Sequence, residues 1–510
     1  MPAHRLLDSW PAAYADRCEM STREQARWLR SVSLQTTGAF AVALLLSRQV
    51  CLAEVLHVPA DYPTAQAALN AAQPGDVVLL SAGEYDESVK TVRGGEPGRR
   101  IVLDGQGVAT LRQFTFQHPW VTVQNLRLTG VTQAYSRLVY FGHGGHYGVL
   151  SNCVLDVAGA PKVYGIEWQA ARVKPFGTGE VASACVVISN EIRNVMGITM
   201  VSVMGDSNRV VGNFLRDGGA VDFFRLFGRD NYIGYNVCSN NYVVEGVGNH
   251  PDFIQTFGNN GDGSLGQVIE GNRVVGVWGG QLTQLEGNLV PEIRDWTFRN
   301  NVFVDIALQA SCTIPEVKYF NNVFYRCNKT NGGHALYFGS RYYSSTYGGR
   351  SGTNHAHGCQ VINNIFLDCG DSRNSVGWYG FGQELTNVVA DYNYVGKAGY
   401  GPVEEDPLRR PIGNPGGWAT WGKWWEPHGI NGGDPGFVNV EKLDFRLREG
   451  SPLIGRGLNL GTLFDTDMWG AVRTAAWDIG PCAYGEGVSK RIVPPPKLHY
   501  VGPPAEPRTE

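Results

Sequence analysis

The sequence predicts an all-β protein, and specifically a single-stranded right-handed parallel β-helix. Three observations lead to this fold class. The 510 residues include 66 glycines, about twice the usual share, and only 18% are charged, as expected when many turns separate many strands. Hydrophobic residues make up 43% of the chain, enough for a large core. Between about residue 120 and residue 400 a short phrase recurs, in which Asn, any residue and an apolar residue follow a strand-like stretch.

The recurring phrase is spaced like the turns of a stacked coil. Its successive asparagines lie 21 to 42 residues apart, with a repeated minimum near 21 to 23. This spacing predicts coils of one cross-section with loops inserted in some of them, whereas propeller blades need an even period near ~40 residues and leucine-rich repeats need a leucine consensus. We expect each asparagine to pair its amide with those of neighbouring coils and to tolerate a left-handed corner. The asparagines are Asn152, Asn190, Asn213, Asn236, Asn272, Asn301, Asn322, Asn364 and Asn393.

Residues 1–53 are predicted to be an N-terminal extension with a signal peptide. The apolar run at 38–46 is too short to span a bilayer, which needs about 20 residues. Arginines precede the run, and small residues at positions 51 and 53 follow it, so we expect export and cleavage after Ala53. Alternatively, the apolar run at 38–46 forms a buried helix. Export would make the protein secreted, periplasmic or attached to the cell surface.

Both ends of the predicted stack carry recognisable segments. Residues 58–72 form a turn and a short Ala-rich amphipathic pattern, and they are followed by Pro74-Gly75-Asp76 and the apolar strand 77–80. This entry segment resembles that of the pectate-lyase-like β-helix superfamily, and the motifs at 434–437, 444–447, 451–454 and 478–480 resemble the terminal block of its secreted bacterial members. The resemblance covers roughly residues 54–485. It implies a short N-terminal capping helix, a β-helix over 54–430 and a C-terminal cap over 431–487, followed by a Pro-rich tail at 488–510.

Three consecutive coils can be aligned residue against residue. The segments 221–228, 251–258 and 281–287 lie at offsets of 30 and 29, and the segment 201–203 precedes them. Two columns of this alignment are mainly apolar, so we expect them to point into the core. Because side chains alternate along a strand, the column between them must point outward. The outward column consists of Ser202, Arg225, Gln255 and Gln284.

Two aspartates stack beside this column, three residues earlier. Asp222 and Asp252 occupy the bend into the strand, and a bend turned outward would place them about one strand spacing apart, where they could share a cation or shift each other's pKa. Alternatively they cap backbone N–H groups, the commonest use of Asp at bends, with Arg225 as an ion-pair partner of Asp222. Further candidates nearby are His250, Glu245, Arg229 and Phe253, the last in a column that parity places outward.

Composition excludes some partners. The formal net charge of −4 gives no positive field for nucleic acid or anionic lipid, so we expect no nucleic-acid partner, and no apolar run is long enough for a membrane span.

Eight of the ten cysteines follow residue 53 without a CxxC pair. Neither a zinc site nor a dense disulfide framework is therefore indicated, and most cysteines are expected to be buried as small apolar residues. We expect a monomer.

The resemblance implies a polysaccharide partner, because polyuronates are the usual substrates of that superfamily. Cleavage by β-elimination requires neutralisation of the uronate carboxylate, a base at C5 and protonation of the leaving O4. We assign His250 as the base, Asp222 and Asp252 as carboxylates that could hold Ca²⁺, and Arg225 as a catalytic contact to the substrate carboxylate. The predicted substrate-binding residues are Gln255, Gln284, Phe253, Arg229 and Glu245.

Two other functions stay open. A glycoside hydrolase could use the stacked aspartates, since carboxylates about 5.5 Å apart imply retention and wider pairs imply inversion. The paired aspartate motifs of galacturonan hydrolases and the signatures of Ca²⁺-dependent lyases are both absent from the sequence, so the reaction type is undecided at this point. The third hypothesis is a non-catalytic carbohydrate-binding or surface protein.

Overall fold

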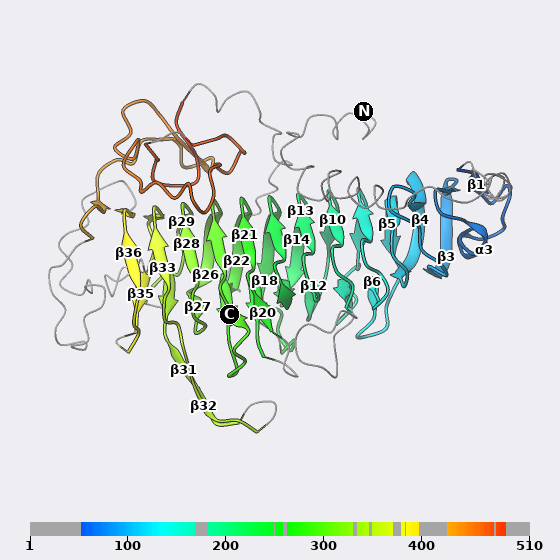
Figure 1. Ribbon diagram of the computed structural model, residues 1–510, viewed down its shortest axis with the longest axis horizontal. Helices are drawn as coiled ribbons and strands as arrows, with labels where there is room; N and C mark the ends of the chain where they lie inside the picture. Colours follow the sequence, from blue (N-terminus) through cyan, green and yellow to red (C-terminus); the bar gives the residue numbers. More distant parts are fainter. Residues whose placement is uncertain are drawn as a thin grey trace, which may run out of the picture. The chain divides into compact units, whose positions relative to one another are not determined.

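The computed structural model describes residues 53–168, 181–248, 250–258, 263–329, 334–345, 349–370, 379–382, 384–396, 426–473 and 476–485 (Figure 1). The predicted signal peptide, up to residue 52, and the predicted tail at 488–510 lie outside these residues. Within the described ranges, no helix has the length and apolar character needed to cross a membrane.

The chain coils through three long ladders of parallel strands, passing from ladder A to B to C in each turn (Figure 1). Ladder A contains β1 (Val55–Val58), β2 (Val77–Leu80), the starts of β4 (Ile101–Phe116) and β5 (Val121–Thr129), β7 (Val149–Ser151), β10 (Val186–Ile188), β13 (Arg209–Val211), β17 (Tyr232–Gly234), β21 (Val268–Glu270), β25 (Thr297–Arg299), β28 (Lys318–Phe320), β33 (Gln360–Ile362) and β36 (Val389–Asp391).

Ladder B contains the start of β3 (Gly83–Lys90), later parts of β4 and β5, β8 (Val154–Asp156), β11 (Glu191–Arg193), β14 (Phe214–Gly219), β18 (Val237–Tyr242), β22 (Arg273–Gln281), β26 (Val302–Leu308), β29 (Val323–Tyr325), β34 (Ile365–Leu367), β37 (Tyr394–Gly396) and β38 (Ile430–Asn431). Ladder C contains the ends of β3 and β4, β6 (Arg137–Phe141), β9 (Tyr164–Trp168), β12 (Thr199–Val203), β15 (Asp222–Leu226), β19 (Asp252–Thr256), β23 (Thr283–Leu285), β27 (Ala310–Cys312), β30 (Leu336–Phe338) and β35 (Tyr379–Phe381). The predicted all-β parallel helix is confirmed.

Smaller sheets lie at the loops of the stack. The parallel strands β16 (Gly228–Arg229), β20 (Ser264–Leu265) and β24 (Ile293–Arg294) extend three consecutive coils beyond ladder C. An antiparallel hairpin, β31 (Ser340–Tyr343) and β32 (Gly352–His355), projects from the coil after β30 (Figure 1). A second antiparallel pair, β39 (Phe437–Asn439) and β40 (Asp444–Leu447), belongs to the C-terminal segment.

Buried asparagines join consecutive coils at the turn between ladders A and B. The backbone N–H and the side-chain Nδ2 of Asn213 both donate to Oδ1 of Asn236, each at 2.9 Å. The same pair of bonds links each asparagine from Asn190 to Asn364 to the next one, and Glu426 accepts the corresponding bonds from Asn393. The expected amide ladder is therefore present, and it satisfies polar groups that have no access to water.

Asn152 does not belong to this ladder. The backbone N–H of Cys153 donates to Asn190 Oδ1 at 2.9 Å, so Cys153 occupies the ladder position. Asn152 instead has a left-handed backbone, with φ 51°, as do Ser189 and Tyr235 at the equivalent corner. The left-handed residue is thus the one before the ladder asparagine, and the ladder residue directly precedes the next strand. The motif in that coil had been aligned one residue too early.

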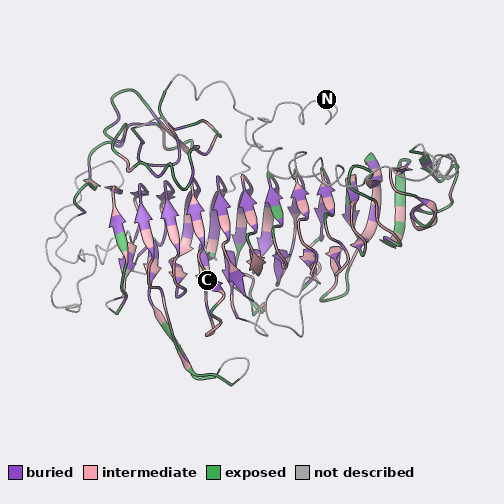
Figure 2. Cartoon of the chain, viewed as in Figure 1, coloured by how far each residue is buried: buried purple, intermediate pink, exposed green. Residues whose placement is uncertain are grey.

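The interior of the stack consists of like side chains at the same position in successive coils. Phe116, Phe141 and Trp168 stack along ladder C with ring centroids 4.4 and 4.3 Å apart, and Phe324 and Phe366 stack along ladder B at 4.7 Å. Figure 2 shows the buried residues running along the strands, with exposed residues in the hairpin and in the C-terminal segment. Such stacks bury large aromatic surfaces, and this burial stabilises each coil against the next.

The two predicted end segments, one at each terminus, both pack against the strands of the β-helix. The N-terminal helix α3 (Ala65–Ala71) is capped by the hydroxyl of Thr64, which accepts from Ala67 N at 3.0 Å, and its buried face includes Leu69. The C-terminal segment covers the outer face of ladder B, where Val302, Val323 and Ile365 form one apolar cluster with its side chains. This part of ladder B is therefore closed to solvent.

Candidate functional site

The outward column predicted from the alignment is present on ladder C. Ser202 pairs with Arg225, Arg225 with Gln255, and Gln255 with Gln284, as in-register partners on β12, β15, β19 and β23. We call these four residues the outer stripe. Their neighbours along the strands, such as Leu226 and Ile254, are fully buried, which follows from the alternation of side chains. The Arg225 side chain is 19% exposed, and Ser202 and Gln255 are buried, at 4% and 9% exposed, so most of the stripe is covered.

Four titratable side chains meet where the chain enters β15 and β19. Asp222 and Asp252 are paired on adjacent strands, and both are fully buried. Arg225 Nε donates to Asp222 Oδ2 at 2.6 Å, and His250 Nδ1 lies 2.8 Å from Asp252 Oδ2. The His250 side chain is 48% exposed. We call Asp222, Arg225, His250 and Asp252 the acid–histidine cluster; it links a buried carboxylate pair to two groups that reach the surface.

The backbone at this bend is fixed by contacts from neighbouring coils. Ala220, with φ 50°, turns the chain from ladder B to ladder C, and its N–H donates to Tyr242 O at 2.6 Å. Pro251 lies at the same bend of the next coil, and Gly280 lies in the coil after that. A Cβ on Gly280 would lie 1.3 Å from Pro251 O, so only glycine allows this approach. Gln281 N donates to Asp252 Oδ1 at 2.9 Å, so Asp252 also has the capping role that the sequence left open.

Burial dominates the electrostatics of the cluster. Burial raises the pKa of Asp222, the Arg225 guanidinium opposes this shift and the neighbouring Asp252 adds to it, and the net result is a rise from 3.8 to about 7. The pKa of His250 is raised chiefly because its ring is hydrogen-bonded to Asp252. Among the described residues, nothing donates to Asp222 Oδ1, which is buried. A proton on Asp222 therefore exchanges near neutral pH, in direct contact with Arg225.

The cluster has the ligand types of a cation site, but it suits Ca²⁺ poorly. The ligand atoms of Asp222, His250 and Asp252 lie within 4.8 Å of one another. Ca²⁺ takes about six to eight oxygen ligands, whereas here one donor is nitrogen, Asp222 Oδ2 faces a guanidinium and Asp252 Oδ1 already binds an N–H. Arg225 is the positive charge that the chain itself places in this cluster.

The other predicted binding residues divide into two groups. Gln255 and Gln284 belong to a chain of hydrogen bonds, in which Gln255 Nε2 donates to Gln284 Oε1 at 3.1 Å and Gln284 Nε2 donates to Glu286 Oε1 at 2.7 Å. Arg341 of β31 is ion-paired with Glu286, so the chain ends on the hairpin. The coil repeat does not specify this partner of Glu286, because the hairpin is inserted after β30 and the repeat does not set its path.

Three predicted binding residues lie elsewhere. The prediction that Phe253 points outward is wrong. Its ring is fully buried and contacts Phe224 and Phe303, with ring centroids 5.7 and 5.9 Å away. Alternation does not hold across the bend, so consecutive side chains both enter the core there. Arg229 lies in β16, where its N–H donates to Asp206 Oδ1 at 2.9 Å. Glu245 is exposed in the loop between β18 and β19.

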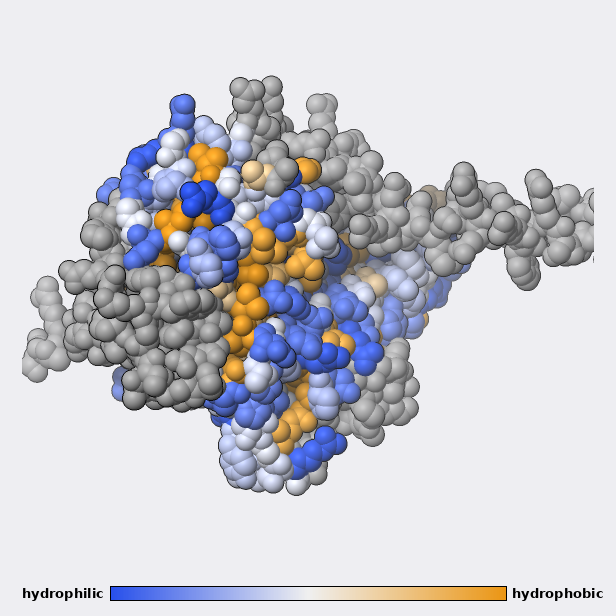
Figure 3. Space-filling view, turned by 60° about the vertical axis from the view of Figure 1, so that its left-hand side comes forward, coloured by the Kyte–Doolittle hydropathy of each residue, from blue (hydrophilic) through white to orange (hydrophobic). Residues whose placement is uncertain are grey.

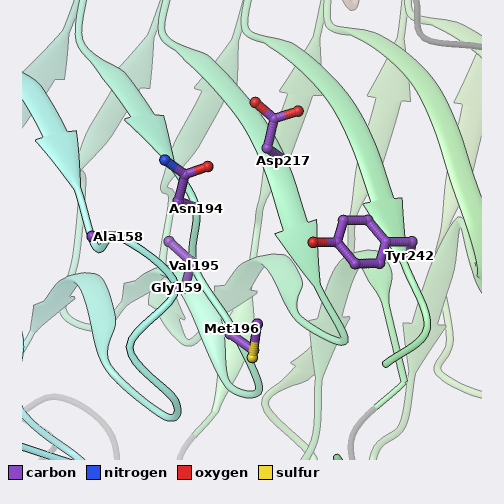
Figure 4. Close-up of a pocket in the computed structure, with 7 residues that line it drawn as sticks. All are labelled: Ala158, Gly159, Asn194, Val195, Met196, Asp217 and Tyr242. Carbon is purple, nitrogen blue, oxygen red and sulfur yellow. The ribbon is translucent and has the colours of Figure 1, made fainter. Parts of the chain in front are cut away.

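A separate pocket of about 270 Å³ lies at the turns between ladders B and C (Figure 4). In Figure 4 the Tyr242 hydroxyl points toward the segment 194–196 across the hollow. Met196 and Tyr242 both pair with Gly219, three residues before Asp222, so the pocket borders the coil that carries the cluster. Its lining residues are Ala158, Gly159, Asn194, Val195, Met196, Asp217 and Tyr242. The strand alignment did not cover these corner positions, so no sequence signal indicated them.

The face of the molecule drawn in Figure 3 is chemically mixed. Figure 3 shows hydrophobic atoms in a band between hydrophilic areas, with the C-terminal segment at the top and the projecting hairpin at the bottom. Tyr342 on the hairpin is 66% exposed.

The chain matches no protein-family model, and no curated protein matches it. Among solved structures, it is similar to a PL6 family polysaccharide lyase from Pseudopedobacter saltans, with 14% identity, a TM-score of 0.48 and coverage of 72% of this chain and 90% of that one. It is also similar to XylC in complex with xylose, with 11% identity, a TM-score of 0.48 and coverage of 83% of this chain and 96% of that one. A GH87 α-1,3-glucanase from Streptomyces thermodiastaticus matches with 13% identity, a TM-score of 0.39 and coverage of 65% of this chain and 66% of that one. Likenesses at this level do not identify an activity, so the function is argued from the side chains of the site.

Proposed function

We propose that this chain is a carbohydrate-active enzyme, a polysaccharide lyase that cleaves an acidic, uronate-containing glycan by β-elimination. The observation that carries the proposal is the acid–histidine cluster: an exposed imidazole held by a buried carboxylate, beside a guanidinium on the outer stripe. Export and action as a monomer are part of the same proposal, and they rest on the sequence.

Arg225 is assigned to the carboxylate of the substrate. A guanidinium beside that carboxylate neutralises it and so acidifies the C5–H bond. Because burial raises the pKa of Asp222 to about 7, Asp222 is partly protonated near neutral pH and then competes less for Arg225. Gln255 and Gln284, joined in one hydrogen-bond chain beside Arg225, are assigned to the orientation of neighbouring sugar hydroxyls.

His250 is assigned as the base. Its Nδ1 is directed at Asp252, which leaves Nε2 of this half-exposed ring as the proton acceptor. Asp252 also stabilises the imidazolium that forms when the C5 proton is taken, which agrees with the raised pKa of His250. The same imidazolium can then return a proton to the leaving O4. Each step uses groups of this chain alone.

Hydrolysis is less compatible with the geometry. A glycoside hydrolase needs two carboxyl groups that reach the glycosidic bond from opposite sides. Asp222 and Asp252 are both fully buried, so neither can contact a polymer at the surface. Their position suits the support of Arg225 and His250 instead, which favours the lyase over the hydrolase.

Incubation with a panel of polyuronates tests the proposal. We expect ultraviolet-absorbing unsaturated ends, and a loss of at least ~100-fold in His250→Ala, the range for removal of a general base. His428→Ala is the matched control, because His428 is also exposed and paired through Nδ1 with a carboxylate, Asp391, at 2.8 Å, but does not belong to the acid–histidine cluster. New reducing ends without absorbance would indicate hydrolysis, and retention without cleavage would indicate binding alone.

A further inference from the structure

Cys327 and Cys369 occupy the same corner of two consecutive coils. They follow β29 and β34, whose register pairs Tyr325 with Leu367. The residue between strand and cysteine is left-handed in both coils, with φ 53° at Arg326 and φ 50° at Asp368. Arg326 N donates to Leu367 O at 3.1 Å, and Gly370 N donates to Cys327 O at 2.9 Å, so the two corners are bonded to each other on both sides of the cysteines.

The two thiols therefore stack. In-register residues of neighbouring strands have Cα atoms about 4.8 Å apart, which falls within the range of about 4.4 to 6.8 Å that a disulfide requires. The sulfurs also have matching surroundings: Cys327 Sγ lies 3.7 Å from Tyr325 O, and Cys369 Sγ lies 3.5 Å from Leu367 O, in each case the carbonyl two residues earlier. Both cysteines are free thiols in this structure.

The pair differs in its access to solvent. Cys327 is 1% exposed, whereas Cys369 is only partly buried. Burial raises the pKa of Cys327, and the adjacent Cys369 thiol contributes in the same direction. Cys369 is thus the thiol that a soluble oxidant reaches first, and Cys327 is placed to react next.

We propose that Cys327 and Cys369 are an oxidative modification site, which forms an intramolecular disulfide and closes the segment between them. That segment contains the hairpin β31–β32. The hairpin reaches the outer stripe through the ion pair of Arg341 with Glu286, which accepts from Gln284. The disulfide would anchor the base of this hairpin beside the outer stripe, whatever the activity of the site is.

A small disulfide such as oxidised glutathione supplies the oxidant. The Cys369 thiol loses its proton and attacks one glutathione sulfur, which forms a mixed disulfide and releases one glutathione thiolate. The Cys327 thiol then loses its proton and attacks the Cys369 sulfur, which releases the second glutathione thiolate. Overall, two protein thiols are oxidised to one disulfide and one oxidised glutathione is reduced to two thiols.

The test uses the folded full chain, treated with oxidised glutathione at mildly alkaline pH. Remaining thiols are alkylated after denaturation, and peptides are mapped by mass spectrometry. We expect a cross-link between the peptides of Cys327 and Cys369, a loss of two hydrogen atoms from the chain, and reversal by dithiothreitol. The oxidised chain should also unfold at a higher temperature than the reduced one, because a cross-link constrains the unfolded state.

Two variants make the result specific. Cys369→Ala should abolish the cross-link and leave Cys327 open to alkylation. Cys153→Ala is the control, since Cys153 is also buried and its sulfur contacts a carbonyl two residues earlier, Ser151 O, at 3.3 Å; it should leave the cross-link unchanged. Alkylation of both Cys327 and Cys369 after oxidation would overturn the proposal, as would a stable glutathione adduct on Cys369.

Discussion

Replacement of Asp222 by Asn should change how the stability of the protein depends on pH. Burial raises the pKa of Asp222 from 3.8 to about 7, so between these values the folded chain keeps a proton that the unfolded chain has released. The unfolded state then binds fewer protons, and the free energy of unfolding falls as pH rises. Below pH 3.8 and above pH 7 the residue binds the same number of protons in both states, and this slope vanishes.

The magnitude follows from the size of the shift. One pKa unit corresponds to 1.36 kcal/mol, so the ionised, buried Asp222 costs at most about 4 kcal/mol at pH 8 relative to pH 4. His250 adds a slope of the same sign: its pKa is raised, so its stabilisation is present at low pH and is lost as pH rises through the folded value. The wild type is therefore compared with Asp222→Asn, because His250 is present in both chains.

Urea unfolding of the wild type and Asp222→Asn, measured from pH 4 to pH 8, gives the required difference. The free energy of unfolding of the wild type, minus that of the variant, should fall by up to about 4 kcal/mol over this interval, with Asn the more stable residue at pH 8. A difference that is constant or rises with pH would refute the buried, proton-sharing position of Asp222.

Three further outcomes are expected. Phe253→Ala should lower the free energy of unfolding by about 3–5 kcal/mol, measured in urea, without changing KM for a glycan, because the ring packs in the core; an altered KM with intact stability would restore its binding role. Asn236→Ala should cost about 2–5 kcal/mol, measured by thermal unfolding, because two buried donors of Asn213 lose their acceptor; a loss below about 1 kcal/mol would contradict this role. Excess chelator should leave the cleavage rate unchanged, since the cluster suits Ca²⁺ poorly; a rate that disappears and returns with Ca²⁺ would contradict the assignment to Arg225.

The fold and the outer stripe were predictable because both depend on local periods. The spacing of the asparagines defines the coil, and alternation within a strand places Arg225 and Gln255 on one face once three coils are aligned. Asn152 was misplaced by one residue, since a corner residue and a ladder residue are both asparagine in other coils, as at 300 and 301.

The bends and insertions were not predictable in this way. Phe253 and Asp222 are buried because of the path of the bend, and that path depends on contacts such as Gly280 against Pro251, which are distant in sequence. Similarly, the contact of Arg341 with Glu286 depends on where an inserted hairpin projects. Local periodicity carries no information about the path of a bend or the direction of an inserted hairpin. The contacts that hold the acid–histidine cluster in place were therefore harder to predict from the sequence than the outer stripe.

The central claim is that Arg225 and His250 act on a substrate that carries a carboxylate. The most direct test compares cleavage of a polyuronate with cleavage of the same polymer after chemical reduction of its carboxyl groups to alcohols. We predict unsaturated products from the acidic polymer and no cleavage of the reduced one, because the neutral polymer offers no carboxylate to the guanidinium and no acidic C5–H to the imidazole. Equal cleavage of both polymers, with new reducing ends, would contradict the account.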